Sequence, residues 1–174
     1  MAKILSDKIP NFRKDLFLSN PKVKEGYLFP DTYFFFSLST TDEIVNDMTL
    51  NFKKRTDPLE TDIKNSGRSF SDIIKMASIL EKEASGKEDI YIISGILWKR
   101  INMGMPLQVD AALNTYKNTG LPVSPICNPG LLAIGAAIHP ENTPYLFYLH
   151  DSDGQVHFAT DFSEHRSNIA RYLK

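Results

Sequence analysis

Two glutamates, Glu81 and Glu83, lie near the end of a segment whose composition is otherwise mostly apolar and small. The apolar residues between positions 69 and 84 recur at spacings of three and four, which predicts a helix with one apolar stripe. On a helical projection Glu81 falls inside this stripe, whereas Glu83 falls at its margin. We therefore expect the Glu81 side chain to point toward the interior of the protein.

A carboxylate that points into an apolar interior is costly unless it is paired. Burial favours the protonated form of a carboxyl group, and a carboxyl group that keeps its proton near neutral pH can act as a general acid. Glu81 is thus the first candidate for acid–base chemistry. The alternative is that Glu81 lies at the edge of the stripe and reaches solvent or a basic partner. Glu81 and Glu83 face different ways, which disfavours a two-carboxylate glycosidase pair.

The sequence has no motif for metal, nucleotide or serine-hydrolase chemistry. The sequence has four histidines, His139, His150, His157 and His165. Their spacing is not that of metal ligands, and there is no HExxH motif. There is no glycine-rich phosphate loop and no GxSxG string. The single cysteine, Cys127, excludes an internal disulfide, and its apolar surroundings predict an inert thiol. We expect no metal and no cofactor.

The composition is that of a globular protein. The chain has 174 residues, 42% of them apolar and 24% charged, with a net charge of -1. This length suits one domain, and this composition excludes a disordered tail or a disulfide scaffold. A nearly neutral chain gives no electrostatic reason to expect binding to nucleic acid or to an anionic membrane. No apolar run is long enough for a membrane span, and the first residues do not form a signal peptide.

The pattern of elements favours an α+β fold, with a mostly helical core, short extended segments and a C-terminal β-hairpin. Capping residues and apolar spacing predict helices at 42–55, 69–84, 88–103, 130–138 and 163–174. The turn at 151–154 joins two predicted strands, 145–150 and 155–159. The aromatic stretch from 27 to 36 is expected to be extended, and residues 1–20 to form an amphipathic entry segment.

Several strings of the sequence resemble, in order, the catalytic domain of the endolytic murein transglycosylases, or YceG-like family. They are EGYLFPDTY (25–33), ASILEKEA (77–84), LWKRINMGMPLQVD (97–110), NTYKNTGLP (114–122), PICNPGLLAIGAAIHP (125–140), YLFYL (145–149) and HFATDFSEHRSNIARYL (157–173). Each string alone is weak, but together they are specific. The resemblance assigns residues 21–174 to the catalytic domain and residues 1–20 to an entry or linker segment from a truncated N-terminal region.

The resemblance implies cleavage of the β-1,4 bond between N-acetylmuramic acid and N-acetylglucosamine within peptidoglycan strands, to give 1,6-anhydro ends. It also implies that Glu81, the first glutamate of the EKE string, is the catalytic residue. A single glutamate would act first as general acid and then as base. One carboxylate suffices because the nucleophile, the C6 hydroxyl of the muramoyl sugar, is already tethered to the substrate.

The resemblance also implies a set of substrate-binding residues: Gln108, Asp110, Asn128, Glu25, Tyr33, Asn114 and Tyr116. Gln108 and Asp110 are two apart, hence on one face of an extended segment, and would bind sugar hydroxyl or N-acetyl groups, with a structural role as the alternative. Tyr33 would stack on a sugar ring, and Glu25 would orient the acid or bind an amide. For Asn128 the alternative role is to cap the helix that follows.

The chain differs from the family pattern at two places. Only three residues separate Asp110 from Asn114, where family members usually have a longer stretch. The membrane helix and LysM-like module that usually precede the catalytic domain are absent. We therefore expect a soluble fragment of a parent protein held at the outer face of the cytoplasmic membrane. The expected partners are peptidoglycan strands, penicillin-binding proteins and the division and elongation machinery.

Two other functions stay open at this point. One is a non-catalytic module that binds peptidoglycan or serves as a scaffold in cell-wall synthesis. The other is a hydrolytic muramidase, which would need a second carboxylate such as Glu25 or Asp110 across from the acid. The ends of the cleaved strands distinguish these alternatives, because a hydrolase leaves reducing ends.

Overall fold

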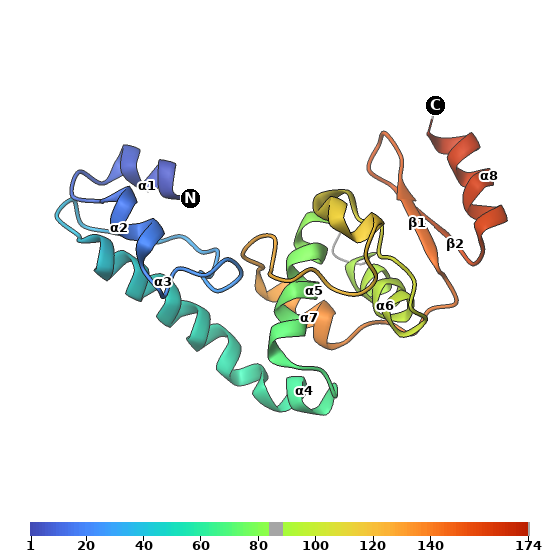
Figure 1. Cartoon of the computed structure of the whole chain (residues 1–174), viewed down its shortest axis with the longest axis horizontal. Helices are drawn as coiled ribbons and strands as arrows, with labels where there is room; N and C mark the ends of the chain where they lie inside the picture. Colours follow the sequence, from blue (N-terminus) through green and yellow to red (C-terminus); the bar gives the residue numbers. More distant parts are fainter. Residues whose placement is uncertain (84–88, 174) are drawn as a thin grey trace.

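The computed structural model describes residues 1–83 and 89–173. Its helices and strands follow one another along an elongated molecule (Figure 1). The N-terminal region contains α1 (Ala2–Lys8), α2 (Lys14–Ser19) and the long α3 (Thr41–Thr56). The middle region contains η1 (Asp57–Leu59), α4 (Glu60–Asn65), α5 (Phe70–Glu83), α6 (Asp89–Asn102), η2 (Asp110–Tyr116) and α7 (Leu131–Ile138). The C-terminal region contains β1 (Phe147–His150), β2 (Val156–Ala159) and α8 (Phe162–Tyr172).

The first 20 residues fold onto α3. Ile9, Phe12 and Phe17 are buried in one apolar cluster with Ile44 and Met48 of α3. Burial of such side chains stabilises each by about 1.5–3 kcal/mol relative to exposure, which is why this segment is helical despite the shortness of α1 and α2. The domain boundary expected at residue 20 stays a prediction.

The predicted helix at 42–55 is confirmed by α3, which begins with a complete capping box. The Thr40 hydroxyl accepts a hydrogen bond from the Glu43 N–H at 3.3 Å, and the Glu43 carboxylate accepts one from the Thr40 N–H at 2.7 Å. Together these bonds satisfy two N–H groups that a helix start otherwise leaves unpaired.

We expect Thr40→Ala to lower the free energy of unfolding by about 1 kcal/mol, because it removes the capping oxygen. Ser37→Ala is the matched control, since Ser37 is exposed and lies outside the helix. Chemical denaturation of both variants measures the effect. Equal stability of the two variants would show that the capping box contributes nothing.

The main core surrounds α5. Ile73, Ile74, Met76, Ile79 and Leu80 are all fully buried, so that α5 is apolar on nearly every side as far as residue 80. Helix α7 packs against it through small, fully buried side chains: Ala133, Ala136 and Ala137. The predicted helices at 69–84, 88–103 and 130–138 are confirmed as α5, α6 and α7, while positions 84 and 88 lie outside the described residues.

The predicted hairpin is confirmed as well. Strands β1 and β2 pair antiparallel, with Phe147 opposite Ala159 and His150 opposite Val156. Helix α8 follows, and the Asp161 carboxylate caps it by accepting a hydrogen bond from the Glu164 N–H at 2.9 Å. The fold is therefore α+β, as predicted. No helix in the described ranges is long and apolar enough to cross a bilayer.

Besides α1 and α2 in the entry segment, two short helical regions of the described residues were not predicted from the sequence. One is the η1–α4 segment, whose first turn contains Pro58. The other is η2, where two 3₁₀ turns are joined by Ala112 with φ of -140° and ψ of 76°. Such short turns produce no apolar periodicity, so a pattern search has nothing to detect.

Candidate active site

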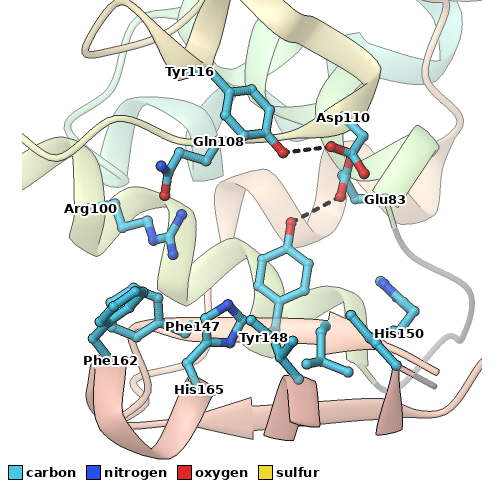
Figure 2. Close-up of a pocket in the computed structure, with 13 residues that line it drawn as sticks. Glu83, Arg100, Gln108, Asp110, Tyr116, Phe147, Tyr148, His150, Phe162 and His165 are labelled. Atoms are coloured by element: carbon cyan, nitrogen blue, oxygen red, sulfur yellow. Dashed lines mark hydrogen bonds between the residues drawn. The ribbon is translucent and has the colours of Figure 1, made fainter. Parts of the chain in front are cut away.

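A cavity of about 490 Å³ lies between the C-terminal end of α5, the η2 segment, β1 and α8 (Figure 2). One side of it is polar and is lined by Glu83, Arg100, Gln108, Asp110 and Tyr116. The other side is largely aromatic or aliphatic and is lined by Phe147, Tyr148, Leu149, His150, Phe162, His165, Ile169 and Leu173. Segments far apart in the sequence thus meet around one space.

Glu83, the last residue of α5, is held in place from β1. The Tyr148 hydroxyl donates a hydrogen bond to Glu83 Oε2 at 3.1 Å, and the Ala111 N–H makes a longer contact of 3.5 Å with Oε1. Burial and the nearby Glu83 carboxylate raise the pKa of Tyr148 well above its ordinary value. Tyr148 therefore stays a neutral phenol, and its hydroxyl remains a hydrogen-bond donor to Glu83 across the physiological pH range.

Gln108, two residues before η2, and Asp110, the first residue of η2, reach the same cavity. Val109 between them is buried and has an extended backbone, and the polar side chains on either side of it both line the cavity. Gln108 has a φ of 53°, an uncommon backbone conformation for a residue other than glycine. The Tyr116 hydroxyl donates to Asp110 Oδ1, and this bond raises the pKa of Tyr116 to about 12. The carboxylate of Asp110 is thus oriented by a neutral phenol.

Arg100 of α6 reaches the cavity from beneath, where Figure 2 shows its guanidinium below Gln108. Its Nε donates to the Leu146 carbonyl at 2.8 Å, and its Nη1 donates to the Leu107 carbonyl at 2.7 Å. These bonds tie β1 and the segment leading to Asp110 to one rigid helix. Arg100 therefore fixes the spacing between the two sides of the cavity.

Three of the residues expected at the site line this cavity, namely Gln108, Asp110 and Tyr116. The other five, Glu81, Glu25, Tyr33, Asn114 and Asn128, are not among its lining residues.

Glu81 is not buried, so the expectation of an interior carboxylate was wrong, and the alternative that it reaches solvent at the edge of the stripe is confirmed. Its side chain is exposed one residue beyond the fully buried Leu80, and its Oε2 accepts a hydrogen bond from the Gly130 N–H at 3.0 Å. Gly130 caps α7, so the carboxylate lies at the positive end of that helix. Water and a helix N-terminus stabilise the charge, whereas burial would have left it uncompensated.

Asn128 does not cap a helix; its side chain accepts hydrogen bonds from the backbone of the 26–28 segment. Its Oδ1 accepts hydrogen bonds from the Gly26 N–H at 2.8 Å and the Leu28 N–H at 3.0 Å, while Gly130 takes the cap position of α7. The helix-capping alternative for Asn128 was therefore wrong. The bonds instead join the 26–28 segment to the start of α7.

The neighbourhood of Asn128 also contains Cys127, Glu25 and Glu81. Burial, with smaller contributions from the two carboxylates, raises the pKa of Cys127 to about 11. Glu25 is exposed there and does not line the cavity. The thiol of Cys127 is therefore protonated at neutral pH and unreactive, as expected.

Tyr33 and Asn114 also lie elsewhere. Tyr33 packs parallel to Phe35, with ring centroids 5.5 Å apart, against the N-terminal cluster, and its hydroxyl donates to the Phe29 carbonyl at 2.8 Å. Its ring face is thus already stacked within the protein. Asn114 is exposed, and its carbonyl accepts the hydrogen bonds that end η2. Among the described residues, no group of His, Cys, Asp and Glu side chains could hold a metal ion.

The chain was compared with known protein families and solved structures. The sequence pattern of the YceG-like family matches residues 1–114 and 112–171, which is nearly the whole chain. The chain belongs to the YceG-like family. A putative yceG-like protein from Listeria monocytogenes, solved by crystallography, superposes with a TM-score of 0.77 at 28% sequence identity, over 95% of this chain and 62% of that one.

Two curated relatives of this YceG-like chain are both called endolytic murein transglycosylase. The protein of Bacillus subtilis is 32% identical over 99% of this chain and 54% of its own length. That of Streptococcus pneumoniae strain D39 is 28% identical over 86% of this chain and 32% of its own length. The chain thus spans about half or less of the length of these relatives.

Five further polar residues line this cavity that the sequence analysis did not place at the site: Glu83, Arg100, Tyr148, His150 and His165. A signal existed for Arg100, which follows Ile93, Ile96 and Leu97 at spacings of seven, four and three, and so lies on the buried stripe of α6. For Tyr148 and His165 there was none, because their position depends on how the hairpin and α8 pack on the rest of the domain.

Proposed function

We propose that this domain is the catalytic part of a peptidoglycan lytic endotransglycosylase, with Glu83 as its single acid–base residue. The observation that carries the proposal is the placement of Glu83 in a cavity of about 490 Å³, fixed by the Tyr148 hydroxyl. A cavity with convergent polar groups and one oriented carboxyl group is the usual form of an active site. The names of the two curated relatives support the same reaction.

The proposed reaction needs no second catalytic carboxylate. Protonated Glu83 gives its proton to the glycosidic oxygen as the bond between that oxygen and C1 of the muramoyl sugar breaks. The Glu83 carboxylate then takes the proton of the C6 hydroxyl of the same sugar, and O6 bonds to C1. The products are a 1,6-anhydro end and a free hydroxyl on the leaving sugar, and no water is consumed.

The geometry favours Glu83 over Glu81 for this role. Glu83 lines the cavity, where Tyr148 bonds its Oε2 and only the longer Ala111 N–H contact of 3.5 Å reaches its Oε1, the oxygen proposed to exchange the proton. Glu81 instead faces solvent and the N-terminus of α7. The resemblance instead implies Glu81 as the catalytic residue, an untested assignment, and the variants Glu81→Gln and Glu83→Gln distinguish the two.

A hydrolytic muramidase is the second candidate, and one observation favours it. Asp110 lines the same cavity as Glu83, and its carboxylate is oriented by Tyr116. A second carboxylate could activate water or stabilise a charged sugar intermediate. In the transglycosylase, Asp110 would bind sugar hydroxyl or N-acetyl groups instead, as would Gln108.

Mass spectrometry of uncrosslinked glycan strands after digestion tests the proposal. We expect fragments with 1,6-anhydro ends, which are lighter by one water than reducing ends. Reducing ends that disappear in Asp110→Asn would establish the muramidase. Binding of strands without any cleavage would contradict both enzymes and leave the non-catalytic binding module.

We further infer, from the resemblance alone, the setting of the whole protein. The expected substrate strands lie outside the cytoplasmic membrane, where a membrane anchor of the parent protein would hold the domain. Penicillin-binding proteins and the division and elongation machinery are the expected partners.

A further inference from the structure

Arg100 is a buried cation at the edge of the cavity. Only 5% of its surface is exposed, and its guanidinium lies 5.0 Å from the ring centre of Phe147. Two of its nitrogens donate to the carbonyls of Leu146 and Leu107. Both acceptors are neutral, so these bonds orient the guanidinium without neutralising its charge.

No carboxylate within residues 1–83 and 89–173 forms an ion pair with Arg100. Glu83 and Asp110 line the same cavity, yet their bonded oxygens face Tyr148 and Tyr116. Over the same ranges, Arg100 Nη2 has no hydrogen-bond acceptor. A buried charge without a counter-ion is costly, and burial accordingly lowers the pKa of Arg100. None of the described residues supplies the counter-ion, so the cavity is suited to an anionic group of a ligand.

The wall beside the guanidinium limits what that group can be. It consists of Phe147, Phe162 and His165, with the His165 ring stacked on Phe147 at 5.1 Å between centroids. Burial, followed by the charge of Arg100, lowers the pKa of His165, so this ring is neutral at pH 7. A single cation next to an apolar wall fits a carboxylate on a small apolar carbon better than it fits a highly charged phosphate.

We propose that Arg100 binds a carboxylate of the murein substrate, carried on a methyl-bearing carbon that packs against Phe147 and Phe162. This inference rests on the proposed function. Murein offers two such groups, the lactyl carboxylate of a muramoyl sugar without a peptide and the terminal alanine carboxylate of a peptide stem. Arg100 would thereby fix which sugar of a strand lies beside Glu83.

Calorimetric titration of the 174-residue chain tests the ligand chemistry directly. The probes are the disaccharide N-acetylglucosaminyl-N-acetylmuramic acid, which lacks the cleavable bond, the same disaccharide with its lactyl carboxyl group amidated, and a form bearing a peptide stem. We expect amidation to weaken binding about tenfold or more, as for loss of a charge-assisted hydrogen bond. Strongest binding by the stem-bearing form would assign the site to the terminal alanine.

Equal binding of all three probes, with neither the lactyl carboxylate nor the stem carboxylate improving the affinity, would overturn the role of Arg100 while leaving the proposed function intact. Failure of all three probes to bind, together with no cleavage of strands, would contradict the proposed function itself. This comparison needs no variant, so it holds even where a substitution of a buried arginine prevents folding.

Two variants then assign the effect to Arg100. Arg100→Gln should remove the preference for the free carboxylate. Lys99→Gln is the matched control, because Lys99 is the neighbouring cation on α6 and donates to the carbonyls of Thr143 and Pro144 outside the cavity. A preference that survives in Arg100→Gln, or that disappears in Lys99→Gln, would contradict the proposal.

Discussion

Glu83→Gln is expected to lower the rate of strand cleavage by about 10³-fold, because an amide can neither donate nor accept the catalytic proton. The substitution keeps the shape of the side chain, and its amide oxygen can still accept the hydrogen bond of Tyr148. The fold should therefore be unchanged. The measurement is the initial rate of release of soluble fragments from uncrosslinked strands, with circular dichroism as the check on folding.

Glu81→Gln is the matched control for this experiment. The two glutamates are two residues apart on α5, and the amide oxygen in Glu81→Gln can still accept the bond from the Gly130 N–H. We expect its rate to stay within about threefold of the parent, as for a surface substitution away from the chemistry. A thousandfold loss in Glu81→Gln with normal activity in Glu83→Gln would reverse the assignment and restore the one implied by the resemblance.

Gly95→Ala is expected to destabilise the domain by about 3 kcal/mol or more, or to prevent folding. Gly95 is a buried residue in the middle of α6, and an added Cβ would overlap the backbone carbonyl oxygen of Glu141. That oxygen cannot rotate away as the end of a side chain could. The segment that would have to move leads directly into β1, which carries Tyr148, so activity should fall with stability.

Gly135→Ala provides the comparison, since Gly135 is also inside a helix. The nearest atom to an added Cβ there is the Tyr91 hydroxyl at 3.7 Å, an ordinary contact. Because alanine favours the helix more than glycine does, we expect Gly135→Ala to raise the free energy of unfolding by about 0.5 kcal/mol. Thermal denaturation of both variants measures the difference. A Gly95→Ala protein as stable as Gly135→Ala would show that the close approach of α6 to residue 141 is not maintained in solution.

The helices and the hairpin could be predicted because their signals are local. Thr40 caps α3, and Ile44, Met48 and Phe52 repeat at a spacing of four along its buried face. The turn at 151–154 lies between two short runs rich in apolar and aromatic residues, which is enough to predict the hairpin. Where spacing and capping agree, sequence alone determines the element.

The sequence could not decide whether Glu81 or Glu83 lies at the cavity. A helical projection shows on which side of a helix a residue lies, but not whether that part of the helix is buried. Helix α5 is buried on nearly all sides up to Leu80 and reaches the surface one residue later. Glu81 therefore points in the direction of the stripe without being buried. Glu83 faces the cavity only because β1, more than 60 residues later, places Tyr148 against it.

The expected substrate-binding residues also differ in whether local spacing or the tertiary fold determines their position. Gln108 and Asp110 could be paired from their spacing, since alternation about the buried Val109 is a local property. Tyr33 and Asn128 could not be placed, because their contacts lie in the N-terminal cluster and on the 26–28 segment. Side chains of these types serve equally well as structural hydrogen-bonding groups, and only the tertiary fold decides which role they have.

The crystal structure of the Glu83→Gln variant with a bound murein tetrasaccharide would test the central claim most directly. We predict that the oxygen of the cleavable bond between muramoyl sugar and glucosamine lies within hydrogen-bond distance of the side chain at position 83, with Gln108 and Asp110 bonded to the sugars. A tetrasaccharide bound instead beside Glu81 and the N-terminus of α7, away from the cavity, would contradict the assignment of the active site.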